Sequence, residues 1–190
     1  MSPWEGLSLV YFDDVEKISK TLRPISDEQK ANAAVALLLK LKNGDLNVLF
    51  VKRAENPADP WSGQVAFPGG KCAAKDVSLK QTVVRETLEE TNINLLDRCR
   101  FLGVLTALVS KPRPDVRILP FVILLEHEPS IVLNKKELTE FVWVSLKEII
   151  RSKRRVKIGF GEVPAYAPRG ATIWGLTYEV LENFIQMCKR

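Results

Sequence analysis

Apolar residues gather in short runs that are separated by turn-forming residues along most of this chain. Residues 33–41 and 46–53 are apolar runs on either side of Asn43-Gly44, and Asn-Gly between two such runs predicts a tight β-hairpin. Residues 118–125 are almost continuously apolar, which predicts a buried central strand. Further strands are expected at residues 64–67, 100–108, 141–144, 156–160 and 163–166, the last two as a hairpin through Gly161.

Helical spacing of apolar residues predicts helices at residues 13–22, 81–93, 147–150 and 173–187, with a turn near 26–31. The last helix collects its apolar residues on one face, formed by Leu176, Val180, Leu181, Phe184 and Cys188. The helix at 81–93 and its approach have one face that we expect to pack against the core, formed by Val77, Val84, Leu88 and Thr91.

The opposite face of the helix at 81–93 carries an acidic cluster. Because a helix advances about 100° per residue, Glu86, Glu89 and Glu90 lie within roughly 100° of one another. Like charges at this spacing repel each other unless a positive group compensates. Arg85 can pair with Glu89, which leaves at least one carboxylate unpaired. Clustered carboxylates with too few basic partners suit a hard cation such as Mg2+, although a solvated acidic face has the same pattern.

The sequence around this helix resembles the Nudix box, which reads G, five residues, E, seven residues and R-E-U-x-E-E-x-G-U, where U is a bulky apolar residue. Here Gly70 is followed after five residues by Asp76 and after eight more by Arg85-Glu86-Thr87-Leu88-Glu89-Glu90-Thr91-Asn92-Ile93. Asp76 replaces Glu, one residue is added after it, Thr87 stands at an apolar position and Asn92 replaces Gly. The last change is mild, because Asn is the best substitute for Gly at a left-handed helix C-terminus. The R-E-x-x-E-E core is intact.

A second resemblance, to the branch of the Nudix family that hydrolyses coenzyme A, lies upstream of the box. That branch has the pattern L-L-T-x-R-[SA], three residues, R, three residues, G, three residues, F-P-G-G. Its two ends are matched here by Leu49-Phe50-Val51-Lys52-Arg53-Ala54 and by Gly63 with Phe67-Pro68-Gly69-Gly70. In the middle the gap is one residue longer, and Asp59 stands where the pattern has Arg. We expect an acid at this position to repel a phosphate.

Two more elements of the resemblance follow the box. Residues 137–146 resemble the family element E-V-x-E-x-x-W-V-x-L, and residues 173–177 resemble the I-W-G-x-T motif of the coenzyme A branch. We expect Trp174 to be a core aromatic residue, with ligand stacking as the alternative. The resemblance implies a single domain over residues 1–190, an α/β/α sandwich with a mixed β-sheet, in which residues 1–31 form a helical extension outside the resemblance.

The resemblance also implies an activity, the divalent-metal-dependent hydrolysis of the diphosphate linkage in a nucleoside diphosphate derivative. Coenzyme A or one of its derivatives is the leading substrate. ADP-ribose, another nucleoside diphosphate derivative and an oxidised nucleoside triphosphate are alternatives. A further alternative is a non-catalytic module of this fold that senses a nucleotide. Such modules typically lose the carboxylates of the box, and this chain keeps Glu86, Glu89 and Glu90, which favours an enzyme.

Individual roles follow from the same resemblance. The expected ligands of Mg2+ or Mn2+ are the Gly70 carbonyl, Glu86, Glu89 and Glu90. Arg85 is expected to hold a carboxylate in place, and Asp76 could act on the metal through a water molecule. The general base is expected to be one of Glu89, Glu90 and Glu137.

The expected substrate-binding residues are Arg53, Gln64, Phe67, Arg113 and Arg117. Two of them, Arg113 and Arg117, belong to a basic loop at 109–117 that contains two prolines. This loop either folds over the substrate phosphates or is an ordinary solvated connection.

Composition and charge fit one domain with an anionic ligand. The 190 residues are 46% hydrophobic, enough for one full core, and the net charge of +5 suits a small phosphorylated compound. No Lys/Arg run has the interleaved aromatic residues of nucleic-acid binding proteins, so we expect no nucleic-acid partner. The short basic cluster at 153–155 is expected to be a solvated turn.

Cysteine and histidine counts argue against other metal and redox chemistries. Three cysteines without paired spacing indicate neither a disulfide framework nor a zinc site, and one histidine, His127, supports neither a zinc centre nor a triad. No signal peptide is visible, and the longest apolar runs, 33–39 and 119–125, fall far short of the roughly 18 residues that span a bilayer. We therefore expect a cytoplasmic protein without a membrane partner, and the family resemblance implies a homodimer.

Overall fold

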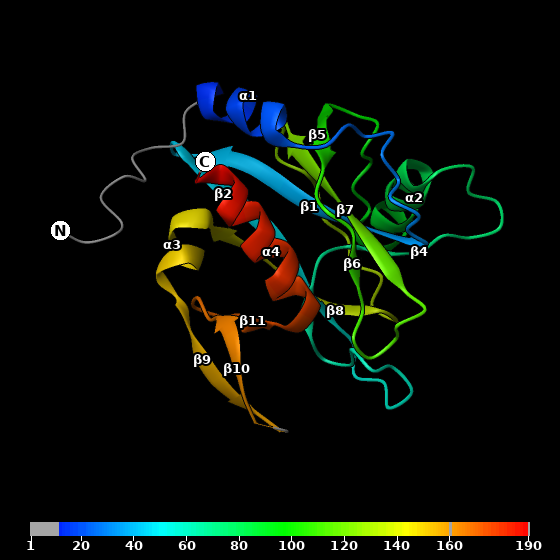
Figure 1. Cartoon of the computed structure of the whole chain (residues 1–190), viewed down its shortest axis with the longest axis vertical. Helices are drawn as coiled ribbons and strands as arrows, with labels where there is room; N and C mark the ends of the chain where they lie inside the picture. Colours follow the sequence, from blue (N-terminus) through cyan, green and yellow to red (C-terminus); the bar gives the residue numbers. More distant parts are fainter. Residues whose placement is uncertain (1–11, 160, 190) are drawn as a thin grey trace.

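A mixed β-sheet lies at the centre of the molecule, and helices cover both of its faces (Figure 1). The structure, a computed structural model, describes residues 12–159 and 161–189. The helices are α1 (Phe12–Thr21), α2 (Leu79–Thr91), α3 (Leu146–Arg151) and α4 (Gly175–Cys188). The strands are β1 (Ala33–Lys42), β2 (Asp45–Arg53), β3 (Val65–Ala66), β4 (Gly69–Lys71), β5 (Cys99–Val104), β6 (Leu108–Val109), β7 (Arg117–Leu125), β8 (Leu138–Ser145), β9 (Lys153–Ile158), β10 (Gly161–Tyr166) and β11 (Ile173–Trp174).

β1 lies in the middle of the main sheet, whose strands follow the order β3-β2-β1-β7-β5. In addition, β4 pairs with β1, β6 with β7 and β8 with β2. β1 and β7 run parallel, whereas β1 and β2 are antiparallel, so the sheet is mixed. The predicted hairpin is confirmed, because Asn43 and Gly44 join β1 to β2 with φ angles of 52° and 71°, the positive values that a type I′ turn requires.

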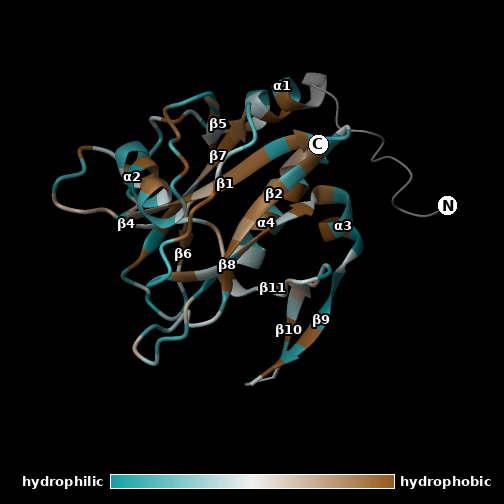
Figure 2. Ribbon diagram, turned by 180° about the vertical axis from the view of Figure 1, so that it is seen from behind, coloured by the Kyte–Doolittle hydropathy of each residue, from teal (hydrophilic) through white to brown (hydrophobic). Residues whose placement is uncertain are grey.

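Both faces of this sheet are buried, which explains why β1 and β7 are apolar at nearly every position instead of alternating. On one face, Leu37 and Leu39 pack in a cluster that includes residues of α1, α3 and α4. On the other face, Ala36 and Leu38 pack in a cluster with Val83 of α2. Figure 2 shows the strands as a hydrophobic centre between helices with polar outer surfaces. The expected α/β/α sandwich is confirmed, and β7 is the expected buried central strand.

The apolar face expected for α2 is partly wrong: Thr91 is buried and Val84 packs against the core as expected, but Val77 and Leu88 do not. Val77 is 91% exposed and Leu88 is 43% exposed, whereas Leu79, Val83 and Thr87 are buried. The reason is the start of the helix: the Ser78 hydroxyl accepts a hydrogen bond from the backbone N–H of Gln81 and caps it, so Val77 precedes the helix. The buried stripe therefore begins at Leu79, and it continues around to Glu90. The predicted left-handed C-terminus at Asn92 is confirmed by its φ angle of 60°.

Three further expectations change in the structure. The strand expected over 100–108 ends at Val104, and β6 follows separately. Residues 153–155 are not a turn but the start of β9, because they pair with β10 in a second sheet of order β11-β10-β9. Residues 173–174 form β11 in that sheet, so α4 begins two residues later than expected. The hairpin of β9 and β10 forms as expected, and Phe160 within it lies outside the described residues.

The helical part of the N-terminal extension packs into the same core as the rest of the chain. Val15 and Ile18 of α1 are buried in the cluster that contains α4. After the helix, Arg23 pairs with Val104 of β5 through backbone hydrogen bonds of 3.1 and 3.0 Å. Residues 1–11 of the extension lie outside the described residues. No helix within the described part of the chain is long and apolar enough to cross a membrane.

The second sheet is joined to α4 by a polar contact at Glu182. The Tyr166 hydroxyl of β10 donates a hydrogen bond to Glu182, and Lys153 Nζ of β9 lies 2.9 Å from both carboxylate oxygens. Partial burial alone would raise the pKa of Glu182, but the hydrogen bonds from Tyr166, Lys153 and Gln186 together lower it to about 2. Folding therefore favours the ionised form of this carboxyl group.

We expect Glu182→Gln to lower the free energy of unfolding at pH 7 by roughly 1.5–3 kcal/mol, because a buried-edge carboxylate with several donors is lost. The folded pKa lies below the ordinary value of 4.5, so this stabilisation is present above pH 4.5 and disappears as the pH falls toward 2. Urea denaturation across this pH range measures it. Glu179→Gln, on the same helix but in an exposed pair with Lys111, is the control. Identical pH profiles for wild type and Glu182→Gln would contradict the prediction.

Candidate active site

Gly69 and Gly70 bring β4 against both β1 and α2. A Cβ atom on Gly69, whose φ angle is 143°, would lie 2.2 Å from the carbonyl oxygen of Ala34 in β1. A Cβ atom on Gly70 would lie 2.6 Å from the carboxyl carbon of Glu86 in α2. Only glycine at both positions lets this turn touch the sheet and the acidic helix at once.

Arg85 holds three carboxylates around one guanidinium group. Its Nε and Nη2 donate to the two oxygens of Asp76 at 3.0 and 2.8 Å, a bidentate pair. Its Nη1 donates to Glu86 Oε1 at 2.7 Å and to Glu89 Oε2 at 3.1 Å. The predicted Arg85–Glu89 pair is therefore present, and Arg85 also orients Glu86.

Asp76 is the buried anchor of this group, with a side chain that is only 1% exposed. Besides Arg85, its Oδ2 accepts hydrogen bonds from the Ala73 N–H at 2.9 Å and from the Thr82 hydroxyl at 3.0 Å. The hydrogen bonds from Arg85 hold the pKa of the Asp76 carboxyl well below its usual range. Although Asp76 is shorter than the Glu of the box, it reaches Arg85 with both oxygens, so its contact is with the arginine.

Glu90 is the acid that α2 turns toward the sheet. Its side chain is buried, and Oε2 accepts a hydrogen bond of 2.8 Å from the backbone N–H of Gly69. Burial raises the pKa of Glu90 to about 8, and the negative charges of Glu86 and Glu137 add to this effect. Burial also raises the pKa of Glu86. A cation bound beside these two acids would offset the cost of keeping them ionised.

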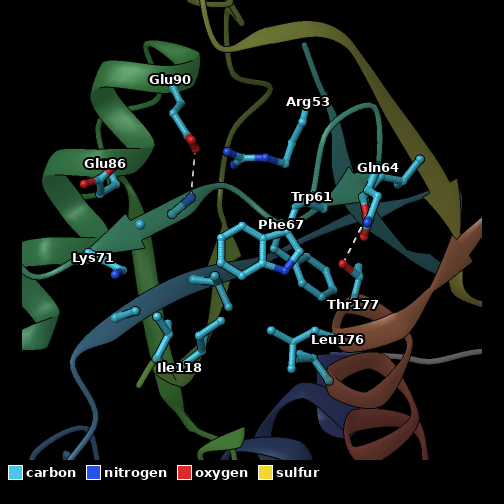
Figure 3. Close-up of a pocket in the computed structure, with 18 of the residues that line it drawn as sticks. Arg53, Trp61, Gln64, Phe67, Lys71, Glu86, Glu90, Ile118, Leu176 and Thr177 are labelled. Carbon is cyan, nitrogen blue, oxygen red and sulfur yellow. Dashed lines mark hydrogen bonds between the residues drawn. The ribbon is translucent and has the colours of Figure 1, made fainter. Parts of the chain in front are cut away.

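A cavity of about 340 Å³ opens next to these acids (Figure 3). Glu86, Glu90 and Glu137 line it together with Gly69 and Gly70. The remaining wall is mostly apolar and is formed by Ala33, Val35, Trp61, Val65, Ala66, Phe67, Val116, Ile118, Leu176 and Val180, with Arg53, Gln64, Lys71 and Thr177 as its polar members. The cavity thus has an acidic end and an apolar end.

The structure brings most of the expected site residues together. Those that line the cavity are Arg53, Gln64, Phe67, Gly70, Glu86, Glu90 and Glu137. Arg85 does not line the cavity, but it contacts two residues that do, donating to Glu86 Oε1 at 2.7 Å and to the Lys71 carbonyl at 3.3 Å. Glu89 does not line the cavity: it is 52% exposed and paired with Arg85. Glu89 and Glu90 are neighbours on the helix and therefore point in directions about 100° apart. Because Glu90 faces the sheet, Glu89 faces solvent.

The two arginines expected to cover the phosphates do not line the cavity. Arg113 forms a bidentate pair with Asp115 at 3.0 Å, and Arg117 Nη1 donates to the Gln29 carbonyl at 3.2 Å. Successive side chains of a strand point to opposite faces, so Arg117 points away where its neighbours Val116 and Ile118 line the cavity. In this arrangement the loop at 109–117 is an ordinary connection that contains the Arg113–Asp115 ion pair.

The sequence reasoning missed several cavity residues, namely Trp61, Lys71, Leu176, Thr177 and Val180. The signal for Trp61 was an aromatic residue within a polar loop that leads directly into the Phe-Pro-Gly-Gly strand. In the motif at 173–177, Leu176 and Thr177 reach the cavity, and the Thr177 hydroxyl donates to the Val65 carbonyl at 3.0 Å. Trp174 is half-buried and is part neither of the cavity wall nor of the buried core clusters, so the expected core position is not confirmed.

The donor set at the acidic end fits Mg2+ or Mn2+ in its chemistry, because it offers carboxylate oxygens beside a glycine turn. Glu86 and Glu90 are partly desolvated acids with raised pKa values, the state in which a cation is most favourable. Within residues 12–159 and 161–189, no three acids, histidines or cysteines lie in an arrangement that could hold a metal ion. Arg85 holds Glu86 and Glu89 in this arrangement.

Comparison with known proteins agrees with this geometry. A family model described as the NUDIX domain matches residues 30–162. An uncharacterized protein of Schizosaccharomyces pombe is 33% identical over 116 residues, which cover 58% of this chain and 35% of that protein. The peroxisomal coenzyme A diphosphatase ndx-8 of Caenorhabditis elegans is 31% identical over 67% of this chain and 54% of its own length. The mitochondrial coenzyme A diphosphatase NUDT8 of Mus musculus is 28% identical over 83% of this chain and 78% of its own length.

The chain thus spans about a third of the yeast relative and about half of the nematode one. Among solved structures, a MutT protein from Methanosarcina mazei has a TM-score of 0.53 at 23% identity, covering 84% of this chain and 96% of that one. A C. elegans Ap4A hydrolase has a TM-score of 0.53 at 19% identity, covering 63% and 83% of the two chains. At such identities the likeness concerns the fold. The family model covers more than half of the sequence, and the chain therefore belongs to the NUDIX family.

Proposed function

We propose that this NUDIX domain is a divalent-metal-dependent pyrophosphohydrolase that cleaves the diphosphate linkage of a nucleoside diphosphate derivative. The observation that carries the proposal is the cavity, with Glu86 and Glu90 at one end and an apolar wall at the other. A linked diphosphate has matching parts, an anionic centre and less polar groups on either side. Named hydrolases among the relatives support the same reaction class.

Glu86 and Glu90 would hold Mg2+ or Mn2+, with the Gly70 carbonyl as a further ligand. A cation there neutralises phosphate charge and lowers the pKa of a bound water. The chain's own residues prepare the ligands: Arg85 fixes Glu86, and the Gly69 N–H fixes Glu90. Glu89 was also expected to be a metal ligand. To bind a cation in the cavity, its side chain would have to break its contact with Arg85 and rotate into the cavity.

Glu137 is the acid that fits the general base best among Glu89, Glu90 and Glu137. It lines the cavity, and its Oε1 accepts a hydrogen bond of 2.8 Å from Asn134 Nδ2, which orients the carboxylate. A water molecule between Glu137 and the substrate phosphorus would transfer its proton to this carboxylate as it attacks. Glu90 is then left for the metal, and it is the alternative base.

Coenzyme A or a derivative is the leading substrate in this proposal, because two of the relatives named above are coenzyme A diphosphatases. ADP-ribose, another linked nucleoside diphosphate or an oxidised nucleoside triphosphate remains the alternative. A non-catalytic sensing module is disfavoured by the retained Glu86 and Glu90 in the cavity wall.

Location and assembly belong to the proposal as well. We propose a homodimer in the cytoplasm, although the nematode relative is described as peroxisomal and the mouse relative as mitochondrial. Light scattering of the purified chain measures the oligomeric state, and imaging of the tagged full-length protein measures the location.

Glu90→Gln tests the proposed reaction. We expect the substitution to lower kcat by at least about 100-fold, because it removes a charged ligand beside the reacting phosphate. The assay measures two phosphorylated products with Mg2+ or Mn2+ from coenzyme A, its oxidised and acyl forms, ADP-ribose, dinucleoside polyphosphates and oxidised dGTP. Glu140→Gln, an exposed acid paired with Lys52 outside the cavity, is the control and should keep wild-type activity.

The outcomes of this assay separate the reaction from the substrate. If wild type and Glu90→Gln are equally inert toward every compound with both metals, the hydrolase proposal is wrong and the sensing module is supported. If ADP-ribose is cleaved and coenzyme A is not, the substrate choice is wrong and the reaction class stands.

Asp76→Asn tests whether the buried anchor prepares the metal site through Arg85. We expect the variant to need about 10–100 times more Mg2+ for half-maximal activity, because Arg85 loses the charge that holds it in place. Asp76→Glu restores the charge and should recover most of the loss. Asp97→Asn, at an exposed acid beside Arg98, is the control. An unchanged Mg2+ requirement in Asp76→Asn would mean that Glu86 and Glu89 suffice to hold Arg85.

A further inference from the structure

Asp59 contacts two different groups with its two carboxylate oxygens. Oδ2 accepts from Arg53 Nε at 2.8 Å and lies 2.7 Å from Arg53 Nη2. Oδ1 accepts a hydrogen bond of 3.0 Å from the backbone N–H of Trp61. The Asp59 side chain is only 14% exposed, so this is a well-shielded contact. The expected repulsion of a phosphate by Asp59 is thus offset by its ion pair with Arg53.

The loop that contains Asp59 and Trp61 is closed by its own hydrogen bonds. The backbone N–H of Ser62 donates to the Asp59 carbonyl at 3.0 Å, and that of Gln64 donates to the Trp61 carbonyl at 3.1 Å. At its start, the N–H of Ala54 donates to the Glu137 carbonyl at 2.8 Å. The backbone of Trp61 is therefore held at both of its polar groups, since its N–H donates to Asp59 Oδ1 and its carbonyl accepts from Gln64, and its side chain lines the cavity.

Trp61 and Phe67 bring aromatic rings to the wall of the cavity (Figure 3). Gln64 and Thr177 lie on the same side of the cavity, away from Glu86 and Glu90, and add an amide and a hydroxyl group. A flat aromatic ring with polar edges suits this combination, since it can stack on the indole and exchange hydrogen bonds at its rim. A purely aliphatic chain would use the apolar wall but would form no hydrogen bond with the Gln64 amide, whose Nε2 donates to the Pro60 carbonyl at 3.3 Å.

The two basic side chains of the cavity wall are Arg53 and Lys71. Arg53 is paired with Asp59, and Lys71 Nζ lies 3.6 Å from Asp115 Oδ2. Because both positive charges have carboxylate partners, phosphate attraction in this cavity depends mainly on the acidic end and its cation. Discrimination among substrates then depends on the end of the cavity opposite Glu86 and Glu90, which carries Trp61 and Gln64.

We propose that Trp61 and Gln64 take the aromatic base of the nucleoside, and that Asp59 is the residue that positions Trp61 for this contact. This inference rests on the proposed function for the identity of the substrate class. It assigns Asp59, which stands where the related pattern has a basic residue, a part in base recognition through the loop.

The test measures binding of ADP and, separately, of inorganic pyrophosphate with Mg2+ to the purified full chain by calorimetry. We expect Trp61→Ala to weaken ADP binding by about tenfold or more, and Trp61→Phe to recover most of it, because stacking is retained. Asp59→Ala should weaken ADP binding to a similar extent. Asp59→Asn keeps an oxygen for the Trp61 N–H and should fall between Asp59→Ala and wild type.

A double variant, Asp59→Ala with Trp61→Ala, should bind ADP within about twofold of the weaker single variant, because both changes remove one contact. Pyrophosphate binding should stay at the wild-type level in the Trp61 variants, which shows that the acidic end is intact, and it should not weaken in the Asp59 variants, because Arg53 loses its carboxylate partner there. Phe141→Ala, at an exposed aromatic residue of β8 outside the cavity wall, is the control.

Three results would overturn the inference. The first is that wild-type protein binds ADP no more tightly than pyrophosphate. The second is that the Trp61 and Asp59 variants bind ADP as wild type does. The third is that Trp61→Ala weakens 4′-phosphopantetheine binding and spares ADP. The last result would assign the aromatic wall to the aliphatic arm of a substrate. None of these measurements needs turnover, so loss of the base contact and failure of the hydrolase proposal are told apart.

Discussion

The Gly69–Gly70 turn approaches β1 so closely that the rest of the site is built on this contact. Val35 and Ala34 of β1 lie opposite Gly69 and Gly70, and the Ala36 N–H donates to the Pro68 carbonyl at 2.8 Å. This pairing aims the Gly69 N–H at Glu90 and leaves room beside Gly70 for Glu86. A side chain at either glycine would separate β4 from the sheet or displace an acid, so local backbone freedom determines where both carboxylates lie.

A cost in electrostatic free energy accompanies that geometry. Glu86 and Glu90 are partly or fully removed from water, and burial raises the pKa of both. Arg85 relieves Glu86 directly, whereas Glu90 accepts a hydrogen bond from the Gly69 N–H. Asp76 is needed in turn, because it anchors Arg85 and has its own support from Thr82 and Ala73. Acids held in this way bind a cation better than solvated acids would, since the desolvation has already occurred in the folded state.

Most of the fold could be predicted from the sequence because its strongest signals are local. The Asn43-Gly44 turn, the apolar run of β7 and the capped acidic helix each depend on neighbours within a few residues. The buried face of α2 could not be predicted in the same way. Thr87 and Glu90 are polar by composition, and only the contacts with β4 and the sheet make that stripe the inner one.

The site residues also differ in whether local sequence could predict them. Glu86 and Glu90 share one helix, so spacing alone indicated that they lie together, whereas Glu137, Trp61 and Thr177 come from three distant segments that meet only in the fold. Arg113 and Arg117 show the converse error, because a basic loop close in sequence to a cavity strand satisfies its charges with Asp115 and Gln29. Charge in a sequence indicates an ionic contact without naming the partner.

Asp59 is another charged residue whose effect depends on its partner in the fold, and it bears on substrate choice. An acid in place of an expected arginine suggests repulsion if each charge is considered alone. In the folded chain the same acid pairs with Arg53 and orients the backbone of Trp61, so its effect passes through an uncharged aromatic ring. Under the proposed function, the helix and the glycine turn would hold the diphosphate, while the loop before β3 would select the substrate. A loop with its own internal hydrogen bonds is suited to this, because a change within it alters which group is recognised without disturbing Glu86 or Glu90.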